Sequence, residues 1–118
     1  KSLLVMTDTG PVLALTAGHN RLDLDTLSGR LERGVRMADA DEARRATGYA
    51  IGGTPPFGHP APIETLIDPA LLEHDVVYAA AGTPDRCFQI GSACLQAVTG
   101  AVPADFVVGH RADPTSAD

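Results

Sequence analysis

Residues 2–17 read SLLVMTDTGPVLALTA and contain two apolar runs on either side of a polar turn. The runs, Ser2–Met6 and Pro11–Ala17, are rich in valine and leucine and have the length of strands. The segment between them, residues 7–10, consists of turn-forming threonine, aspartate and glycine. This stretch therefore predicts two adjacent strands joined as a hairpin.

A first amphipathic helix is expected after the hairpin. Leu24, Leu27 and Leu31 recur at helical spacing, with Asp23 as the N-cap and Gly34 as the residue that stops the helix.

A short strand at residues 35–37 leads into a second expected helix. Asp39 and Glu42 have the spacing of a capping box, and Gly48 can adopt the left-handed conformation that closes a helix. Thr47 lies where this helix opens into a loop.

The second half of the chain alternates loops, strands and short helices. Residues 48–60 are too interrupted by glycine and proline for regular structure, and too apolar for a solvated linker, so we expect an ordered, partly buried loop. Asp68-Pro69 provides a cap and a proline at the first position of a short helical turn. The other expected elements are strands at 63–67 and 76–81, the second of them buried, a break at 82–84, extended structure at 88–90, and a helix at 92–99 closed by Gly100.

Composition and order of elements indicate one α+β domain. The chain has 118 residues, of which 44% are hydrophobic and 20% charged, and its net charge is −6. This is enough chain for one core, and the irregular alternation of strands and helices favours a single compact domain with a mixed sheet flanked by short helices. We predict a domain over residues 1–109 and a frayed tail over 110–118.

Several locations and function classes lose support from the sequence. No apolar run approaches the length of a membrane span, and the start shows no secretion signal, so a cytoplasmic location is the default expectation. Dinucleotide, phosphate-loop and serine-hydrolase motifs do not occur. The four histidines share no ligand spacing, so neither a metal nor another cofactor is expected. Cys87 and Cys94 have no motif spacing and are expected to be apolar core residues.

Three features could carry chemistry. Lys1 is the only lysine of the chain and precedes an apolar strand, where its ammonium group could approach a phosphate or a developing oxyanion, although a solvated strand end is the simpler interpretation. The loop over residues 52–59 combines three glycines with prolines, and could aim rigid main-chain N–H groups at a ligand or simply connect packed elements. Gly82-Thr83-Pro84 is a second such turn.

Basic side chains also gather on and between the two expected helices. Solvated helix faces are the usual reason for such a cluster, but a small contact with a phosphate backbone is an alternative. The acidic net charge argues against extensive nonspecific nucleic-acid binding. The residues are Arg30, Arg33, Arg36, Arg44 and Arg45.

A series of short motifs resembles the YbaK-like editing domains that are associated with prolyl-tRNA synthetase. The resemblance extends from Lys1 to about residue 105. Family members begin with a further helical segment before the position of Lys1, and this sequence lacks it. The motifs, in order, are Lys1-Ser2-Leu3, Met37-Ala38-Asp39, Thr47-Gly48-Tyr49, the loop 52–59 (GGTPPFGH), Asp68-Pro69, and Ala80-Ala81-Gly82-Thr83-Pro84.

The resemblance implies a barrel-like mixed sheet and a trans-editing deacylase, which hydrolyses the ester of a tRNA that carries the wrong small amino acid. Its expected partners are the 3′ CCA end of an aminoacyl-tRNA and a prolyl-tRNA synthetase. The family pattern places Lys1 near the terminal adenosine and Gly58 at the ester. With the Gly82-Thr83 turn these are the expected catalytic residues, and substrate binding is expected from Thr47, Gly53, Pro56, Phe57 and His59.

Two alternatives to a freestanding deacylase remain from the sequence. One is a noncatalytic module that binds tRNA ends or small metabolites, and the other is an editing insert of a larger synthetase. Some relatives carry an acidic residue at the position that a rough alignment gives to Cys87, so a role that depends on an acid there is not expected in this chain. Cys87 could instead shape the pocket, although core packing is the simpler interpretation.

Overall fold

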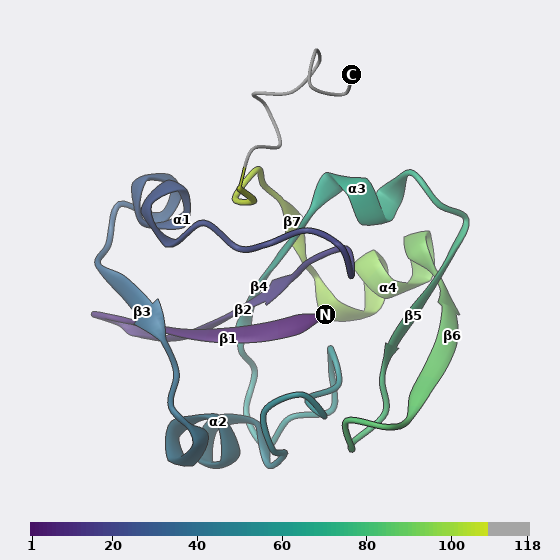
Figure 1. Cartoon of the computed structure of the whole chain (residues 1–118), viewed down its shortest axis with the longest axis horizontal. Helices are drawn as coiled ribbons and strands as arrows, with labels where there is room; N and C mark the ends of the chain where they lie inside the picture. The colour runs from purple at the N-terminus through teal and green to yellow at the C-terminus, as the bar shows by residue number, and fades with distance from the viewer. Residues whose placement is uncertain (109–118) are drawn as a thin grey trace.

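The computed structural model describes residues 1–108 and shows a mixed sheet with helices on both sides. In Figure 1, α1 lies above the sheet and α2 below it, while α3, α4 and a separate two-stranded ribbon lie at the other end. The strands are β1 (Ser2–Thr7), β2 (Gly10–Leu15), β3 (Val35–Met37), β4 (Glu64–Ile67), β5 (Val76–Ala80), β6 (Cys87–Gly91) and β7 (Val102–Pro103). The helices are α1 (Leu24–Leu31), α2 (Ala40–Thr47), α3 (Pro69–Leu72) and α4 (Ser92–Thr99).

The predicted hairpin forms the centre of the sheet. Strands β1 and β2 are antiparallel, with Leu4 opposite Leu13 and Thr7 opposite Gly10. Strand β3 extends the sheet antiparallel on the β1 side, whereas β4 and then β7 extend it parallel on the β2 side. The α+β class with a mixed sheet is therefore confirmed, and the sheet is open, in the order β3-β1-β2-β4-β7.

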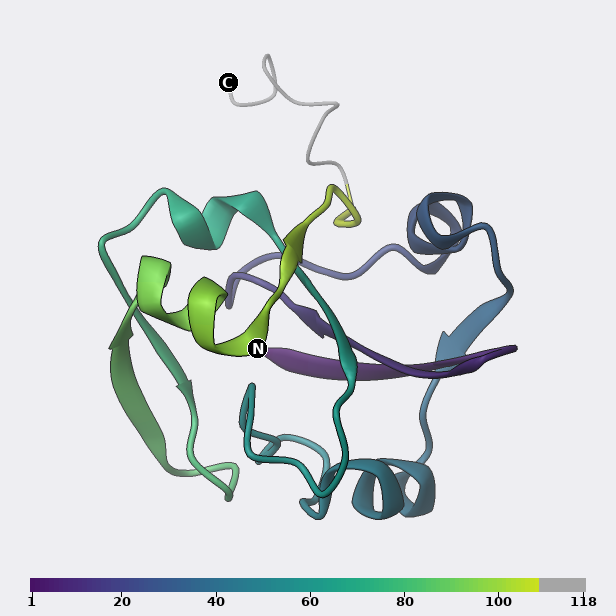
Figure 2. The same cartoon turned by 180° about the vertical axis from the view of Figure 1, so that it is seen from behind.

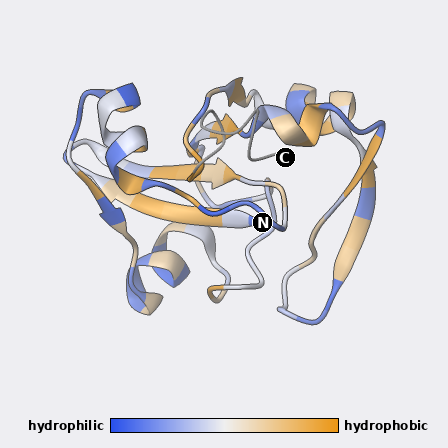
Figure 3. Cartoon of the chain, turned by 45° about the horizontal axis from the view of Figure 1, so that its top comes forward, coloured by the Kyte–Doolittle hydropathy of each residue, from blue (hydrophilic) through white to orange (hydrophobic). Residues whose placement is uncertain are grey.

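Both faces of this sheet are covered because its central strands are apolar at successive positions. Leu4 and Leu13 contribute to a core with α2, α4 and β5, while Val5 and Val12 point to the opposite face. The second core includes Leu27 of α1 and Phe106 from the chain after β7. In Figure 3 the sheet strands are accordingly the most continuously hydrophobic part of the molecule.

Local capping signals set most helix ends as predicted. Asp23 caps α1, and the Asp39–Glu42 capping box begins α2. Gly48 ends α2 in the left-handed conformation, at a φ of 84°. The expected stop at Gly34 is wrong, since α1 ends at Leu31 and Glu32 takes the left-handed conformation, with its main-chain N–H bonded to the carbonyl of Ser28.

Strands β5 and β6 form an antiparallel ribbon of their own. The expectation of a buried strand at 76–81 is wrong for most of β5: Val77 is buried, but Val76 and Tyr78 are exposed. The reason is that β5 pairs with β6 alone, so the ribbon has one face against the core and one toward solvent. Both cysteines are exposed thiols rather than core residues, because Cys87 lies on this ribbon and Cys94 on the outer side of α4.

The described residues, 1–108, are expected to contain neither a membrane-spanning helix nor a cluster of metal ligands. None of their helices has the length and apolar character that crossing a membrane requires. In the same residues no three or more histidine, cysteine or acidic side chains come together as metal ligands. The predicted tail, residues 110–118, lies outside the described residues.

Candidate active site

A pocket of about 400 Å³ opens between the sheet, α2 and the β5–β6 ribbon. Its walls come from the start of β1, the β3–α2 junction, the loop after α2, and both strands of the ribbon. Figure 2 shows how that loop lies between α2 and the turn of the ribbon. The lining residues are Lys1, Ser2, Leu3, Leu4, Gly18, Met37, Ala38, Ala43, Ile51, Gly52, Thr54, Tyr78, Ala79, Ala80, Pro84, Arg86 and Cys87.

Lys1 is held at the pocket by the first and second strands. Its main-chain nitrogen donates to the carbonyl of Thr16 at 2.6 Å, and the Thr16 N–H donates back to the Lys1 carbonyl at 2.8 Å. The side chain is exposed, and its Nζ donates to the main-chain oxygen of Asn20 at 2.7 Å. The ammonium therefore has a fixed neighbour while it remains accessible to a ligand.

The glycine-rich loop (residues 52–59) and the second glycine turn (Gly82-Thr83-Pro84) are in direct contact. The Gly82 N–H donates to the Gly53 carbonyl at 3.0 Å. A Cβ on Gly53 would lie 2.8 Å from both the Gly82 oxygen and the Thr83 Cα, so only glycine fits there without a shift of the main chain. Next to this contact, Gly52 (φ 90°) faces Pro84 and lines the pocket.

Thr47 and Thr83 use their hydroxyl groups within their own segments. The buried Thr47 Oγ1 donates to the Ala43 carbonyl at 2.7 Å and accepts from the Tyr49 N–H at 3.0 Å, which fixes the exit from α2. The Thr83 Oγ1 donates to Asp85 Oδ1 at 2.7 Å. Neither threonine lines the pocket, so both support its walls from outside.

The end of the glycine-rich loop faces a different hollow, of about 280 Å³, beside α4 and β4. Phe57, Gly58 and His59 line it, and the His59 Nε2 lies 2.8 Å from the Pro55 carbonyl oxygen. The Phe57 ring packs edge-on against Phe88, with ring centres 5.8 Å apart. Lys1 thus lines one pocket with Gly52 and Thr54 of the loop, whereas Gly58 lines the other hollow.

Pro56 lies between the hollow beside α4 and the residues around Lys1. It lines the hollow of Gly58 and also a small cavity of about 20 Å³ that it shares with Lys1 and Tyr78. Of the predicted binding residues, Pro56 thus lines a cavity that Lys1 also lines, and Gly53 is in contact with the Gly82-Thr83 turn.

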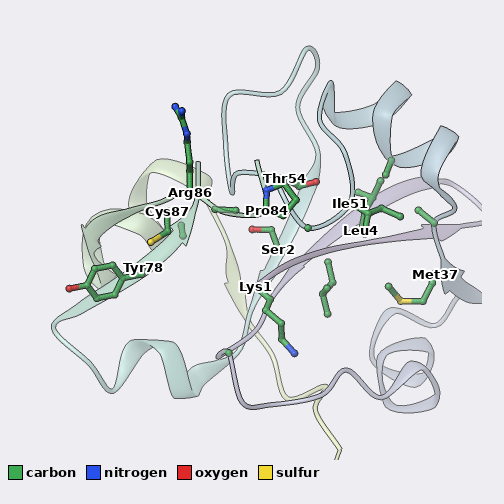
Figure 4. A pocket seen from close by; sticks show the side chains of 17 residues that line it. Lys1, Ser2, Leu4, Met37, Ile51, Thr54, Tyr78, Pro84, Arg86 and Cys87 are labelled. Atoms are coloured by element: carbon green, nitrogen blue, oxygen red, sulfur yellow. The ribbon is translucent and has the colours of Figure 1, made fainter. Parts of the chain in front are cut away.

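Several pocket residues were missed by the sequence analysis. Tyr78 is 65% exposed, and Ile51 and Met37 are also exposed, although large apolar side chains usually avoid solvent. Figure 4 shows Tyr78 and Cys87 on one side, Met37 and Ile51 on the other, and the Arg86 guanidinium extending away at the rim. Residues 76–80 read VVYAA and show no polar–apolar alternation, so the sequence pattern gave no signal for an exposed Tyr78.

The charge of the pocket is opposite to that of the whole chain. Lys1 and Arg86 are among its lining residues, and none of the lining residues is acidic or a histidine. The chain as a whole carries −6. Such a site favours an anionic or oxyanionic ligand and offers apolar walls beside it.

Two arginines of the expected basic cluster form ion pairs with glutamates. Arg33 bonds Glu64 at 3.0 Å and Arg36 bonds Glu42 at 2.6 Å. The pair with Arg36 lowers the pKa of the Glu42 carboxyl to about 2, mainly through the hydrogen bond between the two side chains. Two of the five arginines thus already have carboxylate partners.

The family model for the aminoacyl-tRNA editing domain matches residues 1–98 of the chain. This chain belongs to the aminoacyl-tRNA editing domain family. The match contains every pocket wall described above, from Lys1 at the start of β1 to Cys87 on the ribbon.

Solved structures share this editing-domain fold. A protein described as a candidate trans-editing enzyme for prolyl-tRNA synthetase is 41% identical, with a TM-score of 0.89 over 92% of this chain and 69% of its own. A scaffold protein for epitope grafting by computational design is 38% identical, with a TM-score of 0.89 over 92% and 70%. A hypothetical protein is 31% identical, with a TM-score of 0.83 over 91% and 72%.

Proposed function

We propose that this editing domain is a deacylase that hydrolyses the ester between a mismatched small amino acid and the 3′ end of a tRNA. The observation that supports the proposal is a pocket lined by Lys1, by the main chain of Gly52 and by apolar side chains, with no aspartate or glutamate among its lining residues. The 3′ end of a tRNA offers the matching groups: an anionic backbone, a base, and a small side chain on an ester.

The need for such an activity follows from the limits of a binding pocket. A synthetase separates side chains that differ by one methylene by only ~1–3 kcal/mol, so small amino acids require a second site that removes mistakes. The pocket walls include alanines, Ile51 and Met37, which suit a small apolar side chain.

In the proposed reaction, water attacks the carbonyl carbon of the aminoacyl ester. A new bond forms between the water oxygen and that carbon, the bond to the ribose oxygen breaks, and the ribose oxygen takes up the proton that water gives up. Lys1 stabilises the negative charge that develops, or the terminal phosphate beside it. The contact between Gly53 and Gly82 keeps the main chain of Gly52 and Thr54 in place against the substrate.

Catalytic roles for Gly58 and for the Thr83 hydroxyl stay predictions. Gly58 lines the other hollow and the Thr83 hydroxyl is bonded to Asp85. Our mechanism gives the Gly82-Thr83 turn a supporting role instead, through the main-chain contact with Gly53.

One observation favours a second candidate, a module that binds the tRNA end without hydrolysing it. The lining residues include no aspartate, glutamate or histidine, so the pocket of the described chain provides no ordinary general base. In the deacylation proposed above, water and groups of the substrate take the place of such a base.

A panel of charged tRNAs tests both candidates. Because one structural relative is described as a candidate trans-editing enzyme for prolyl-tRNA synthetase, tRNA for proline charged with alanine, cysteine or serine is the first set, with correctly charged prolyl-tRNA as control. A deacylase releases at least one mismatched amino acid faster than buffer does. Saturable binding of these tRNAs with release at the buffer rate would instead establish the binding module.

A further inference from the structure

A chain of hydrogen bonds runs from a buried carboxylate to the Lys1 ammonium. Asp68, at the end of β4, is 1% exposed. Its Oδ2 accepts from the Asn20 Nδ2 at 2.7 Å and from the Ala17 N–H at 3.2 Å. The main-chain oxygen of Asn20 in turn accepts from the Lys1 Nζ at 2.7 Å.

The loop after β2 is closed by these bonds into a rigid unit. The Asn20 N–H donates to the Ala17 carbonyl at 3.0 Å, so the same short turn is bonded to itself and to Asp68. The Asp68 N–H also donates to the Leu15 carbonyl at 2.8 Å, which ties the carboxylate to the parallel β2–β4 pair. The Asn20 oxygen is thereby held in place relative to the sheet.

Capping of α3 does not account for this arrangement. The cap uses the other carboxylate oxygen, since Oδ1 accepts from the Ala70 N–H at 3.0 Å. Oδ2 reaches across the fold to a loop 48 residues earlier. A buried carboxylate is costly unless its oxygens are hydrogen-bonded, so the Asp68 site strongly favours the loop conformation that supplies these donors.

We infer that Asp68 and Asn20 are positioning residues that hold the Lys1 ammonium at the pocket. This role rests on the proposed function of Lys1. An ammonium has three donors, and within residues 1–108 the Asn20 oxygen is the one acceptor of the Lys1 Nζ, so two donors remain for a substrate. A lysine that is already oriented loses less side-chain entropy when the substrate binds.

The single lysine of the chain makes this inference measurable without substrate. Protein labelled with ¹³C-lysine gives one set of lysine side-chain signals, and relaxation of the Cε methylene reports how ordered the Lys1 side chain is. The test variant is Asn20→Ala, which removes the bond to Asp68 and keeps the main-chain oxygen. The matched control is His19→Ala, at the exposed neighbouring position in the same turn.

We expect an ordered Cε methylene in the wild-type protein and in His19→Ala, and a mobile one in Asn20→Ala. We also expect kcat/KM for deacylation to fall about tenfold in Asn20→Ala only, as for the loss of one hydrogen bond in a charged network. A mobile Lys1 in the wild-type protein, or equal behaviour of the two variants, would overturn the inference.

Two further measurements keep the outcomes separate. Circular dichroism checks that Asn20→Ala is folded. If this variant does not fold, the relaxation of the Lys1 Cε methylene in the wild-type protein becomes the test, and a mobile methylene there overturns the inference. If the wild-type protein deacylates no tRNA, the proposed function fails, while the relaxation comparison still decides whether Asp68 and Asn20 hold Lys1.

Discussion

The central sheet and the β5–β6 ribbon are built from similar residue types but differ in what covers them. In β2, the four residues from Val12 to Leu15 are buried, and β1 has Leu4 and Val5 buried beside them. Across both strands of the ribbon, only Val77 is buried. The sheet is enclosed by the cores on its two faces, whereas the ribbon has solvent on one side.

This difference assigns separate tasks to the two regions. The sheet fixes the main chain at Lys1, because Lys1 and Thr16 exchange two main-chain hydrogen bonds at the end of the β1–β2 pair. The ribbon contributes exposed side chains to the same pocket, with Tyr78, Arg86 and Cys87 at or beside the mouth. A ligand would therefore meet a rigid wall on one side and accessible side chains on the other, as is common for sites carried on a stable scaffold.

Truncation of a side chain in each region should show the contrast in stability most strongly. Leu13→Ala removes a fully buried side chain from the central strand and should lower the free energy of unfolding by ~2–5 kcal/mol. Val76→Ala, at an exposed position of β5, should change it by less than ~0.5 kcal/mol. Urea unfolding followed by circular dichroism measures both. Equal losses would show that the ribbon is as tightly packed as the sheet.

Gly53→Ala tests the contact that joins the loop to the ribbon turn. The new Cβ would lie 2.8 Å from main-chain atoms of Gly82 and Thr83, so the two segments must separate. We expect a loss of ~1–3 kcal/mol in the free energy of unfolding, as for overpacking, together with slower deacylation.

Gly29→Ala is the matched control for that substitution. Gly29 lies in α1 and a Cβ there meets nothing within 4 Å, so the change should be neutral or stabilising by up to ~1 kcal/mol. If Gly53→Ala behaves like Gly29→Ala in both measurements, the loop and the turn do not depend on each other.

Tyr78→Ala tests whether the exposed face of the ribbon contacts the substrate. We expect the Tyr78 ring to stack on a base of the tRNA 3′ end, so its loss should weaken binding of a CCA-ending oligonucleotide about tenfold. Tyr78→Phe keeps the ring and should bind like the wild-type protein. Because Tyr78 is exposed, the unfolding midpoint should hardly move. Unchanged affinity in Tyr78→Ala would remove the ribbon face from the binding site.

The smallest expected effect concerns the ion pair between β3 and α2. The pKa of Glu42 is lowered from 4.5 to about 2, mainly by the hydrogen bond from Arg36. Since the folded-state pKa is below the ordinary one, the pair stabilises the fold above pH 4.5 and loses this effect as the pH falls toward 2. Arg36→Gln should raise the pKa of Glu42, seen by carbon NMR titration, and Arg44→Gln should not. If the midpoint of the Glu42 titration is the same in Arg36→Gln as in the wild-type protein, the hydrogen bond from Arg36 is not the cause of the low pKa.

Much of the fold could be predicted because its signals are local. The Asp39–Glu42 capping box and Gly48 act within one or two turns, and the hairpin at residues 2–17 needs only its own turn. The end of α1 was placed too late because Glu32, which is not a glycine, takes the left-handed conformation. A bond from its main-chain N–H to the Ser28 carbonyl closes the helix there, and no residue type signals it.

The site was less predictable because its parts meet only in the folded chain. Both glycine turns were recognised, but their contact joins Gly53 to Gly82, which lie far apart in the sequence. Which glycine of the loop would face Lys1 depends on the path of residues 52–59, and that path takes Gly52 to the pocket and Gly58 to the other hollow. Composition alone treats the two glycines alike.

The central claim is that the Lys1 ammonium at this pocket promotes hydrolysis of a misacylated tRNA. The most direct measurement is the initial rate of amino acid release from the fastest substrate of the tRNA panel, compared between wild-type protein and Lys1→Ala. We predict a rate lower by about a hundredfold or more, as for the loss of a group that stabilises developing charge, with the unfolding midpoint nearly unchanged. Equal rates in the two folded proteins would contradict the account.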